Sequence, residues 1–318
     1  MRTVDLFSGC GGMSLGFQNA GYEIIAAFDN WNEAVEVYRS NFKHPVYVRD
    51  LSNIEDISDI KMLKPDVIIG GPPCQDFSSA GLRQETSEKA DLTIRYAQII
   101  SEVQPRFFVM ENVERVQKSN AFKFSRGILK DAGYGITQII LDASFCGVPQ
   151  RRKRFFMVGE QSGNDGFLDY FLKKNLSKES MTLKEYFGDS LDVKHYYRHP
   201  RSYTRRGVFS VDEPSPTIRG VNRPIPEGYP GHLGDSTTNL CEVRPLTTFE
   251  RACIQTFPPS FVFLGSKTQL EQMIGNAVPV KLAEYVANAL RDYVDFRTCD
   301  DRDDELVNQF ICLEQLSL

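Results

Sequence analysis

The sequence is short of several features that mark large classes of protein. It has no CxxC pair and its seven cysteines are scattered, so neither a disulfide framework nor a structural zinc site is expected. No apolar run approaches the ~18 residues of a membrane-spanning helix. The chain passes from Met1 directly into a strand pattern, without a signal-peptide core. We therefore expect a cytoplasmic protein with no membrane partner and no bound metal.

A strong net charge is also missing, since the formal charge at pH 7 is only −5. The charge is nevertheless uneven along the chain. Seven Lys and Arg residues face two acids between Lys194 and Pro224, whereas seven acids face two arginines between Asp295 and Leu318. Because a run of charge is most often only a solvated face, the basic stretch by itself leaves nucleic-acid binding open.

What the chain does contain is an alternation of short apolar strand patterns and helical patterns over its first 160 residues. This alternation predicts an α/β fold with a doubly wound, Rossmann-like sheet, in which ligands bind at the carboxyl ends of the strands. A chain of 318 residues is long enough to add a second, smaller domain.

A rigid loop after one predicted strand holds a cysteine. The strand pattern Pro65–Ile69 leads into Gly70–Ser78, where two glycines and two prolines restrict the backbone around Cys74. This is a costly way to hold a cysteine that serves only packing. A free cysteine is, however, most often a small buried hydrophobe, so the loop alone is equally compatible with catalysis and with packing.

A glycine turn joins the first predicted strand to the first helix. Ser8–Gly12 follows the strand Thr3–Phe7, an arrangement in which the backbone can approach a cofactor closely. The next strand ends at Asp29, where a carboxylate can accept from ribose hydroxyls. A third strand leads to Asp50, which could contact an adenine amino group or simply cap a turn. Because the turn is not GxGxxG, an adenosine cofactor other than a nicotinamide dinucleotide is favoured.

Charged residues also mark two later strands. Glu111 ends the apolar run Arg106–Met110, and a carboxyl group beside an apolar wall holds its proton more tightly, as a general acid must. An ordinary turn or helix cap would account for it equally well. Four consecutive cations, 151–154, precede the strand Phe155–Gly159 and are hard to bury without anions, which indicates a phosphate or carboxylate site.

Together these segments resemble the ordered motif set of the DNA cytosine-5 methyltransferases, and in size the bacterial type II modification enzymes of restriction systems. Five segments occur in the family's order: Asp5–Gly12, Gly71–Gln75, Glu111–Val113, Gln150–Arg154 and Gln272–Pro279. Any one of them is modest support, but chance does not readily give all five in order. The resemblance spans roughly residues 3 to 290.

The resemblance implies S-adenosyl-L-methionine as the methyl donor. The family often carries an Arg-Gly pair after the cysteine loop, where this chain reads Lys89–Thr93, so only Leu92 of that segment is an expected contact. The implied donor contacts are Phe7, Gly9, Gly11, Gly12, Asp29, Asp50, Pro73, Leu92 and Asn276.

The family resemblance also implies a catalytic mechanism. Cys74 would add to C6 of cytosine, which makes C5 nucleophilic, and Glu111 would hold the N3 edge and supply a proton. Arg152 and Arg154 would hold the base and the backbone. Because C5 is unreachable inside a stacked duplex, the base should be flipped out of the helix.

Double-stranded DNA is the implied partner, and methylation would protect host DNA from a cognate restriction endonuclease. The basic stretch falls where the family has its target-recognition domain, which makes it an expected DNA surface. We expect a monomer with a catalytic domain at 1–160, a recognition domain at 161–245, a returning segment at 246–294 and an acidic tail at 295–318. The expected DNA contacts are Gln150, Thr217, Arg219 and Arg223.

Other functions remain to be weighed. An RNA (tRNA) cytosine-5 methyltransferase with the same catalytic motifs is the alternative, although the long recognition segment favours DNA. A non-catalytic binding module is disfavoured, because Cys74, Glu111 and both arginines are present. An NAD-linked oxidoreductase would need a dinucleotide fingerprint that the chain lacks.

Overall fold

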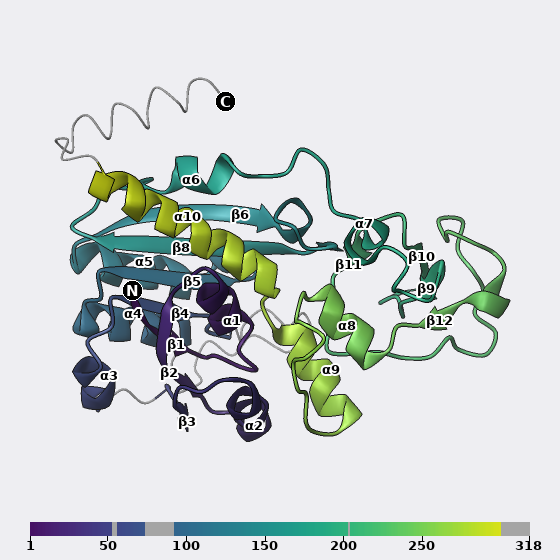
Figure 1. The fold of residues 1–318 in the computed structure, drawn as a ribbon, viewed down its shortest axis with the longest axis horizontal. Helices are drawn as coiled ribbons and strands as arrows, with labels where there is room; N and C mark the ends of the chain where they lie inside the picture. Colours follow the sequence, from purple (N-terminus) through teal and green to yellow (C-terminus); the bar gives the residue numbers. More distant parts are fainter. Residues whose placement is uncertain (53–55, 74–91, 203, 300–318) are drawn as a thin grey trace.

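The computed structural model describes residues 1–52, 56–73, 92–202 and 204–299, and its centre is one seven-stranded sheet (Figure 1). The strand order is β3-β2-β1-β4-β5-β8-β6. The pairs from β3 to β5 are parallel, and β8 runs antiparallel to both of its neighbours. The strands are β1 (Arg2–Leu6), β2 (Glu23–Asp29), β3 (Val46–Val48), β4 (Val67–Gly70), β5 (Phe107–Asn112), β6 (Tyr134–Asp142) and β8 (Lys153–Gln161).

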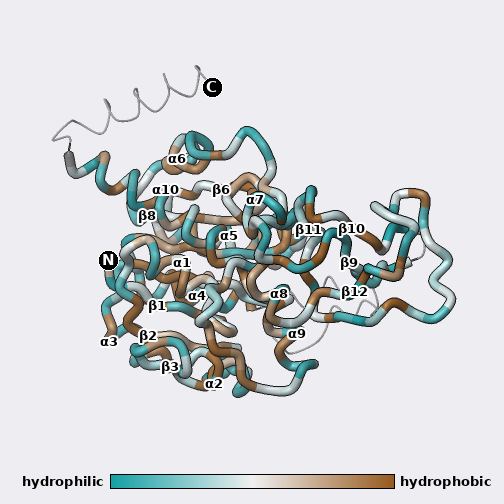
Figure 2. Tube along the Cα trace, turned by 45° about the vertical axis from the view of Figure 1, so that its right-hand side comes forward, coloured by the Kyte–Doolittle hydropathy of each residue, from teal (hydrophilic) through white to brown (hydrophobic). Residues whose placement is uncertain are grey.

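Helices cover both faces of this sheet, which confirms the predicted α/β fold. Strands β4 and β5 are buried along their whole length, as expected for continuous apolar runs in a parallel sheet. One face packs on α1 (Gly12–Asn19) and α10 (Val280–Cys299). The other packs on α3 (Ser58–Met62), α4 (Leu92–Val103) and α5 (Asn120–Asp131). In Figure 2 the hydrophobic segments are concentrated in the sheet and in the helices packed on it.

The strand order reverses between β1 and β4. From β1 the chain builds outward through β2 and β3, and from β4 it builds in the opposite direction through β5. In doubly wound folds the loops diverge at such a reversal and leave a crevice at the carboxyl ends of the strands. The predicted glycine turn follows β1, and the predicted cysteine loop begins at the end of β4.

A third hydrophobic cluster joins the N-terminal helix α2 (Asn32–Asn41) to the C-terminal helices α8 (Thr248–Ile254) and α9 (Lys267–Asn276). Both C-terminal helices begin with capping boxes, Thr247 with Glu250 and Ser266 with Gln269, which satisfy amide groups at the helix starts. The chain then crosses back to the sheet as α10.

Residues 183–202 and 204–245, called the small lobe below, extend to one side of the sheet (Figure 1). They form a three-stranded sheet of order β10-β9-β12 and a short strand β11 that pairs in parallel with β7 before β8. The small-lobe elements and β7 are α7 (Leu183–Phe187), β9 (His195–Tyr197), β10 (Val208–Ser210), β11 (Ser215–Pro216), β12 (Arg244–Pro245) and β7 (Gln150–Arg151). The described residues also contain the 3₁₀ segments η2 (Glu114–Lys118), η3 (Ala143–Phe145) and η4 (Leu240–Glu242).

Two predicted boundaries lie close to elements that pack on the sheet. Shortly after residue 161, where the recognition domain is predicted to begin, Phe167 and Phe171 beside α6 (Asp169–Lys173) are buried in the sheet core against α10. The amide of Leu168 also donates to Thr137 Oγ1 on β6 at 3.0 Å. At the other end, α10 continues to Cys299, so the predicted acidic tail starts inside a helix; residues 300–318 lie outside the described part. Among the described residues, no helix combines the length and apolar character that crossing a bilayer requires.

Candidate active site

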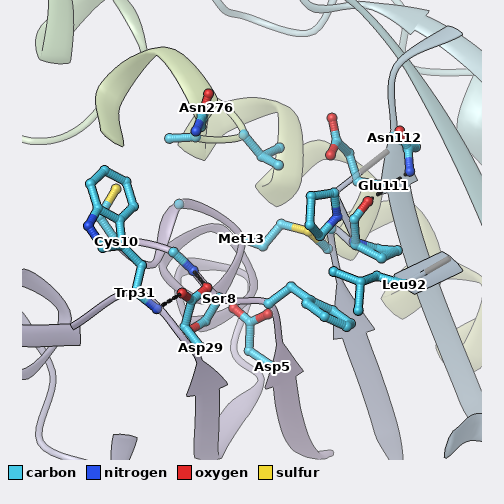
Figure 3. Close-up of a pocket in the computed structure, with 18 of the residues that line it drawn as sticks. Asp5, Ser8, Cys10, Met13, Asp29, Trp31, Leu92, Glu111, Asn112 and Asn276 are labelled. Carbon is cyan, nitrogen blue, oxygen red and sulfur yellow. Dashed lines mark hydrogen bonds between the residues drawn. The ribbon is translucent and has the colours of Figure 1, made fainter. Parts of the chain in front are cut away.

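A cavity of about 500 Å³ opens at the carboxyl ends of β1, β2, β4 and β5, beside the reversal of strand order. Its size suits a small-molecule ligand. Figure 3 shows Asp5, Asp29 and Glu111 around it, with Asn276 on the opposite side. Eleven predicted site residues line it: Phe7, Gly9, Gly12, Asp29, Asp50, Pro73, Leu92, Glu111, Arg152, Arg154 and Asn276.

The remaining predictions fall elsewhere. Cys74, the expected nucleophile, lies outside the described residues, although Pro73 directly before it lines the cavity. Gly11 does not line the cavity but belongs to the turn that shapes it. The four expected DNA contacts lie outside the lining as well.

The glycine turn is held in an unusual backbone conformation. Phe7 has a φ of 59°, in the left-handed region that residues with a side chain rarely adopt, and Gly11 has a φ of 94°. A Cβ on Gly11 would collide with the rings of Tyr38 and Phe42. The turn therefore needs glycine there both for its dihedral angle and for its packing on α2.

The same turn is closed from the C-terminal side. A Cβ on Gly12 would collide with the carbonyl oxygen of Val278, so only glycine lets this segment approach so closely. Asn276, at the end of α9, lines the cavity there, and its Oδ1 accepts from Gln272 at 3.2 Å. The segments around Gly12 and Asn276 thus form one wall of the cavity.

Asp29 fixes the turn as well as facing the cavity. Its Oδ2 accepts from the Gly9 amide at 2.7 Å and its Oδ1 from the Trp31 amide at 2.8 Å. Burial raises the pKa of Asp29, and these amide bonds oppose the shift. A carboxylate has further lone pairs, so the geometry leaves room for the expected ribose contact. For Asp50 the turn cap is the role that is seen, since its Oδ1 accepts from the Ser52 amide.

Glu111 and Arg154 form a buried ion pair across β5 and β8. Arg154 Nε lies 2.7 Å from Glu111 Oε1, and the side chains are 15% and 10% exposed. Burial raises the pKa of Glu111, while the nearby arginines oppose the rise. Asn112 Nδ2 donates to the Pro72 carbonyl at 3.0 Å and ties the cysteine-bearing loop to the same strand end. A buried carboxyl group whose pKa is raised therefore stands beside a guanidinium in the cavity wall.

Arg152 is committed mainly to the backbone, a role the sequence did not suggest. Its Nη1 donates to the Ile218 carbonyl and its Nη2 to the carbonyls of Gly275 and Ala277, all at 3.0 Å. Burial lowers the pKa of Arg152 well below its usual range. Arg152 lines the cavity, and its buried Nε has no partner among the described residues. Arg152 thus joins three chain segments and still presents one donor.

Gln150 requires a correction, because the structure leaves it no surface for a DNA contact. It is fully buried, its Nε2 donates to Gln255 Oε1 at 2.7 Å, and its Oε1 accepts from the Ile218 amide. Gln255 in turn donates to the carbonyls of Ile274 and Ala277. Both glutamines support the wall of the site. Nothing in the local pattern around Gln255 marked it in advance.

Asp5 and Ser8 are cavity residues that the sequence reasoning missed. Asp5 is 1% exposed; its Oδ2 accepts from Ser14 Oγ at 2.6 Å, and Ser14 accepts from the Tyr38 hydroxyl at 2.7 Å. Asp5 Oδ1 and Ser8 Oγ are buried without a partner among the described residues. Burial raises the pKa of Asp5 to about 7. The available signal was an acid between the apolar residues Val4 and Leu6 of the first strand.

These unpartnered atoms indicate what the cavity holds. Buried polar groups in native proteins are nearly always satisfied, and Asp5 Oδ1 can accept while Arg152 Nε can donate. A ligand with a cationic donor group beside an anionic or carbonyl group would satisfy both. S-adenosylmethionine carries an ammonium, a sulfonium and a carboxylate, so the donor set fits it.

The expected DNA-contacting residues of the small lobe differ in solvent exposure and in their hydrogen bonds within the protein. Thr217 Oγ1 donates to the Arg151 carbonyl at 2.8 Å, beside the β7–β11 pair. Arg219 is half-buried and its Nη2 donates to the His199 carbonyl at 2.5 Å, whereas Arg223 is exposed. Of the two arginines, Arg223 is the one displayed to solvent.

Comparisons with known proteins agree with this geometry. The C-5 cytosine-specific DNA methylase family matches residues 1–292, and the chain belongs to this family. It is 56% identical over 295 residues to the type II methyltransferase M.HindV of Haemophilus influenzae, covering 92% of this chain and 97% of that protein. It is 54% identical to M.HgiDI of Herpetosiphon aurantiacus, covering 92% and 95% of the two chains.

Among solved structures, the Entamoeba histolytica methyltransferase EhMeth superposes with a TM-score of 0.71 at 20% identity, covering 92% of this chain and 98% of that one. At this identity the likeness supports the fold alone. With the family match and the two high-identity relatives, the protein is a DNA (cytosine-5-)-methyltransferase.

Proposed function

We propose that the protein flips a cytosine of duplex DNA into the cavity and methylates its C5 through a covalent adduct of Cys74. The observation that carries this proposal is the buried Glu111 and Arg154 pair in the cavity wall at the end of β5, directly beside the loop that leads to Cys74. The bound S-adenosyl-L-methionine supplies the methyl group.

Residues of the glycine turn and of α9 would hold the donor. Phe7, Gly9, Gly12 and Asn276 line the cavity together with Asp5, whose Oδ1 has no hydrogen-bond partner among the described residues. We expect this oxygen to accept from the donor's ammonium group, since an ion of opposite charge and a hydrogen bond both favour a buried carboxylate. Asp29 would accept from the ribose hydroxyls with the lone pairs that the Gly9 and Trp31 amides leave unused.

The chain's residues would then carry out the addition and elimination. The Cys74 thiolate forms a bond to C6, and the electron pair moves onto the ring as Glu111 gives its proton to N3. Arg154 holds Glu111 and would contact the base. Methyl transfer to C5 breaks the S–CH3 bond of the donor and leaves S-adenosylhomocysteine. The C5 proton then leaves to a base, the electron pair re-forms the C5–C6 double bond, the thiolate is expelled, and N3 returns its proton to Glu111.

The small lobe would contact the duplex, with Thr217, Arg219 and Arg223 as its first candidates. The two high-identity relatives are named type II methyltransferases. We therefore infer that methylation by this protein protects DNA from a cognate restriction endonuclease, and that it acts as a monomer in the cytoplasm.

An adduct experiment tests the chemistry. If Cys74 adds to C6, replacing the C5 hydrogen by fluorine blocks the final elimination. Duplex DNA with 5-fluorocytosine at the target, incubated with the donor, should give a denaturant-resistant adduct on the Cys74 peptide. Cys74→Ser should give none, because a hydroxyl is far less ionised than a thiol. An adduct on Cys10 or Cys146 would overturn the assignment.

A comparison of substrates distinguishes a DNA methyltransferase from the RNA alternative. Duplex DNA and transfer RNA, offered side by side to the same preparation with labelled donor, should show methyl transfer to DNA. Transfer confined to RNA would replace DNA as the proposed substrate and leave the adduct chemistry standing.

A further inference from the structure

One leucine of the small lobe stands apart from its apolar neighbours. Tyr197, Val208 and Val243 form a small core, and three further apolar residues of the lobe pack against it: Ile225, Tyr229 and Leu240. Leu233 takes no part, since its relative exposure is 107%. Single exposed leucines are common, so exposure alone gives Leu233 no function.

The turn that carries Leu233 is held from several sides, however. Asp235 Oδ1 accepts from the amides of Gly207 and Val208 at 2.8 and 2.9 Å. Its Oδ2 accepts from the Tyr229 hydroxyl and the His232 amide, at 2.8 and 2.9 Å. Burial would raise the pKa of Asp235, but these hydrogen bonds lower it, so the carboxylate remains an acceptor.

His232 completes the support on the other side of the leucine. Its Nδ1 accepts from the Gly234 amide at 2.9 Å, which leaves Nε2 as the donor to the Thr204 carbonyl at 3.1 Å. Leu233 therefore lies between two residues whose side chains fasten the backbone. A tip fixed in this way loses little conformational entropy when it meets a partner.

The segment that this turn contacts carries exposed cations. His232 bonds the Thr204 carbonyl, and Arg205 next to Thr204 and Arg201 three residues before it are exposed. Arg223 is a third exposed arginine of the small lobe. Arg206 is instead engaged with Glu213 and lies over the Phe209 ring, 4.3 Å from its centroid. Exposed cations beside a rigid apolar tip complement a polyanion that offers apolar base edges between its phosphates.

We propose that Leu233 is a recognition residue that contacts base edges in a groove of bound DNA, while the arginines around it contact phosphates. The proposal rests on the DNA substrate proposed above and adds a specificity-determining contact to it. An apolar side chain gains affinity by leaving water and releases no counterions, so its contribution differs from that of an arginine. This difference makes the two kinds of contact separable by salt.

The experiment measures binding of the full chain, with S-adenosylhomocysteine, to a duplex containing its methylation site over a range of salt concentrations. Leu233→Ala should weaken binding about tenfold, from the apolar burial lost, with an unchanged slope of log affinity against log salt. Arg205→Ala should make that slope shallower by about 1. Met62→Ala, which truncates a side chain 75% exposed on α3, is the matched control and should bind as wild type.

Two results would overturn the proposal. In the first, the Leu233→Ala protein binds DNA and selects its site as the Met62→Ala protein does. This would show that the leucine is only an exposed side chain. In the second, the wild-type protein sediments as a dimer and the Leu233→Ala protein as a monomer. That result would show that Leu233 contacts a second copy of the chain rather than DNA. Melting temperatures should match in all variants, because these side chains are exposed. A wild-type protein that binds no duplex would instead contradict the proposed function itself.

Discussion

The cavity and the small lobe place their charged side chains differently. In the cavity, Asp5, Glu111 and Arg152 are 1%, 8% and 1% exposed, and each is held by a neighbouring residue or backbone group. In the small lobe, Arg201, Arg205 and Arg223 are displayed to solvent. Burial alters proton affinity, which chemistry uses, whereas exposure leaves a cation ready to meet phosphates. Substitutions in the two regions should therefore change different observables.

The largest expected effect is on the rate of methyl transfer. Glu111→Gln removes the proton source but keeps the shape of the cavity, so the single-turnover rate should fall by about 10²- to 10⁴-fold. Affinity for S-adenosylhomocysteine should change little. Glu114→Gln, on the exposed η2 segment, is the control and should retain the wild-type rate. A wild-type rate in Glu111→Gln would remove Glu111 from the chemistry.

The next effect is on stability and tests whether Arg152 joins the two regions. Arg152→Met would leave the carbonyls of Ile218, Gly275 and Ala277 without their donor, at a cost of about 3 kcal/mol in the free energy of unfolding. Chemical denaturation should show it. Arg151→Met removes the exposed neighbouring cation and should be close to wild type. Equal stability of the two variants would show that the three backbone contacts contribute little.

A smaller effect should appear in the pH dependence of donor binding. Burial raises the pKa of Asp5 to about 7, so near pH 6 the folded state keeps a proton that the unfolded state has lost. The free energy of unfolding therefore falls as pH rises from the ordinary carboxyl pKa of about 4 towards about 7.

The ammonium group of the ligand favours ionised Asp5, so affinity for S-adenosylhomocysteine should rise with pH up to about 7, by at most about tenfold per unit, and then level off. Asp5→Asn should lose most of this slope in calorimetric titrations between pH 5.5 and 8.5. Asp131→Asn, an exposed carboxyl on α5, should keep it. A slope that persists in Asp5→Asn would assign the titration to Asp29 or Glu111, whose pKa values burial also raises.

The smallest effect concerns the small lobe. Arg223→Ala should reduce the salt slope of DNA binding by about 1 and leave the melting temperature unchanged, because the side chain is exposed. Arg219→Ala should lower the melting temperature as well, since its guanidinium donates to the His199 carbonyl. If both variants kept the wild-type salt slope and site choice, neither arginine would contact DNA.

Local sequence determined the elements and most of the cavity wall. The glycine turn, the strand-end acids Asp29 and Glu111 and the cysteine loop follow from interactions between residues near one another in the chain. The sheet then brought them to one edge, as alternating strands and helices predict.

Only the tertiary structure decided how Arg152, Gln150, Asp5 and Leu233 are used. Arg152 reaches carbonyls 66 to 125 residues away, and Gln150 meets Gln255 across 105 residues. No local pattern encodes such contacts, because they depend on which surfaces pack together once the elements have formed. The same packing buries one oxygen of Asp5 that has no partner in the described part of the chain, and it leaves Leu233 outside a core that takes in its apolar neighbours.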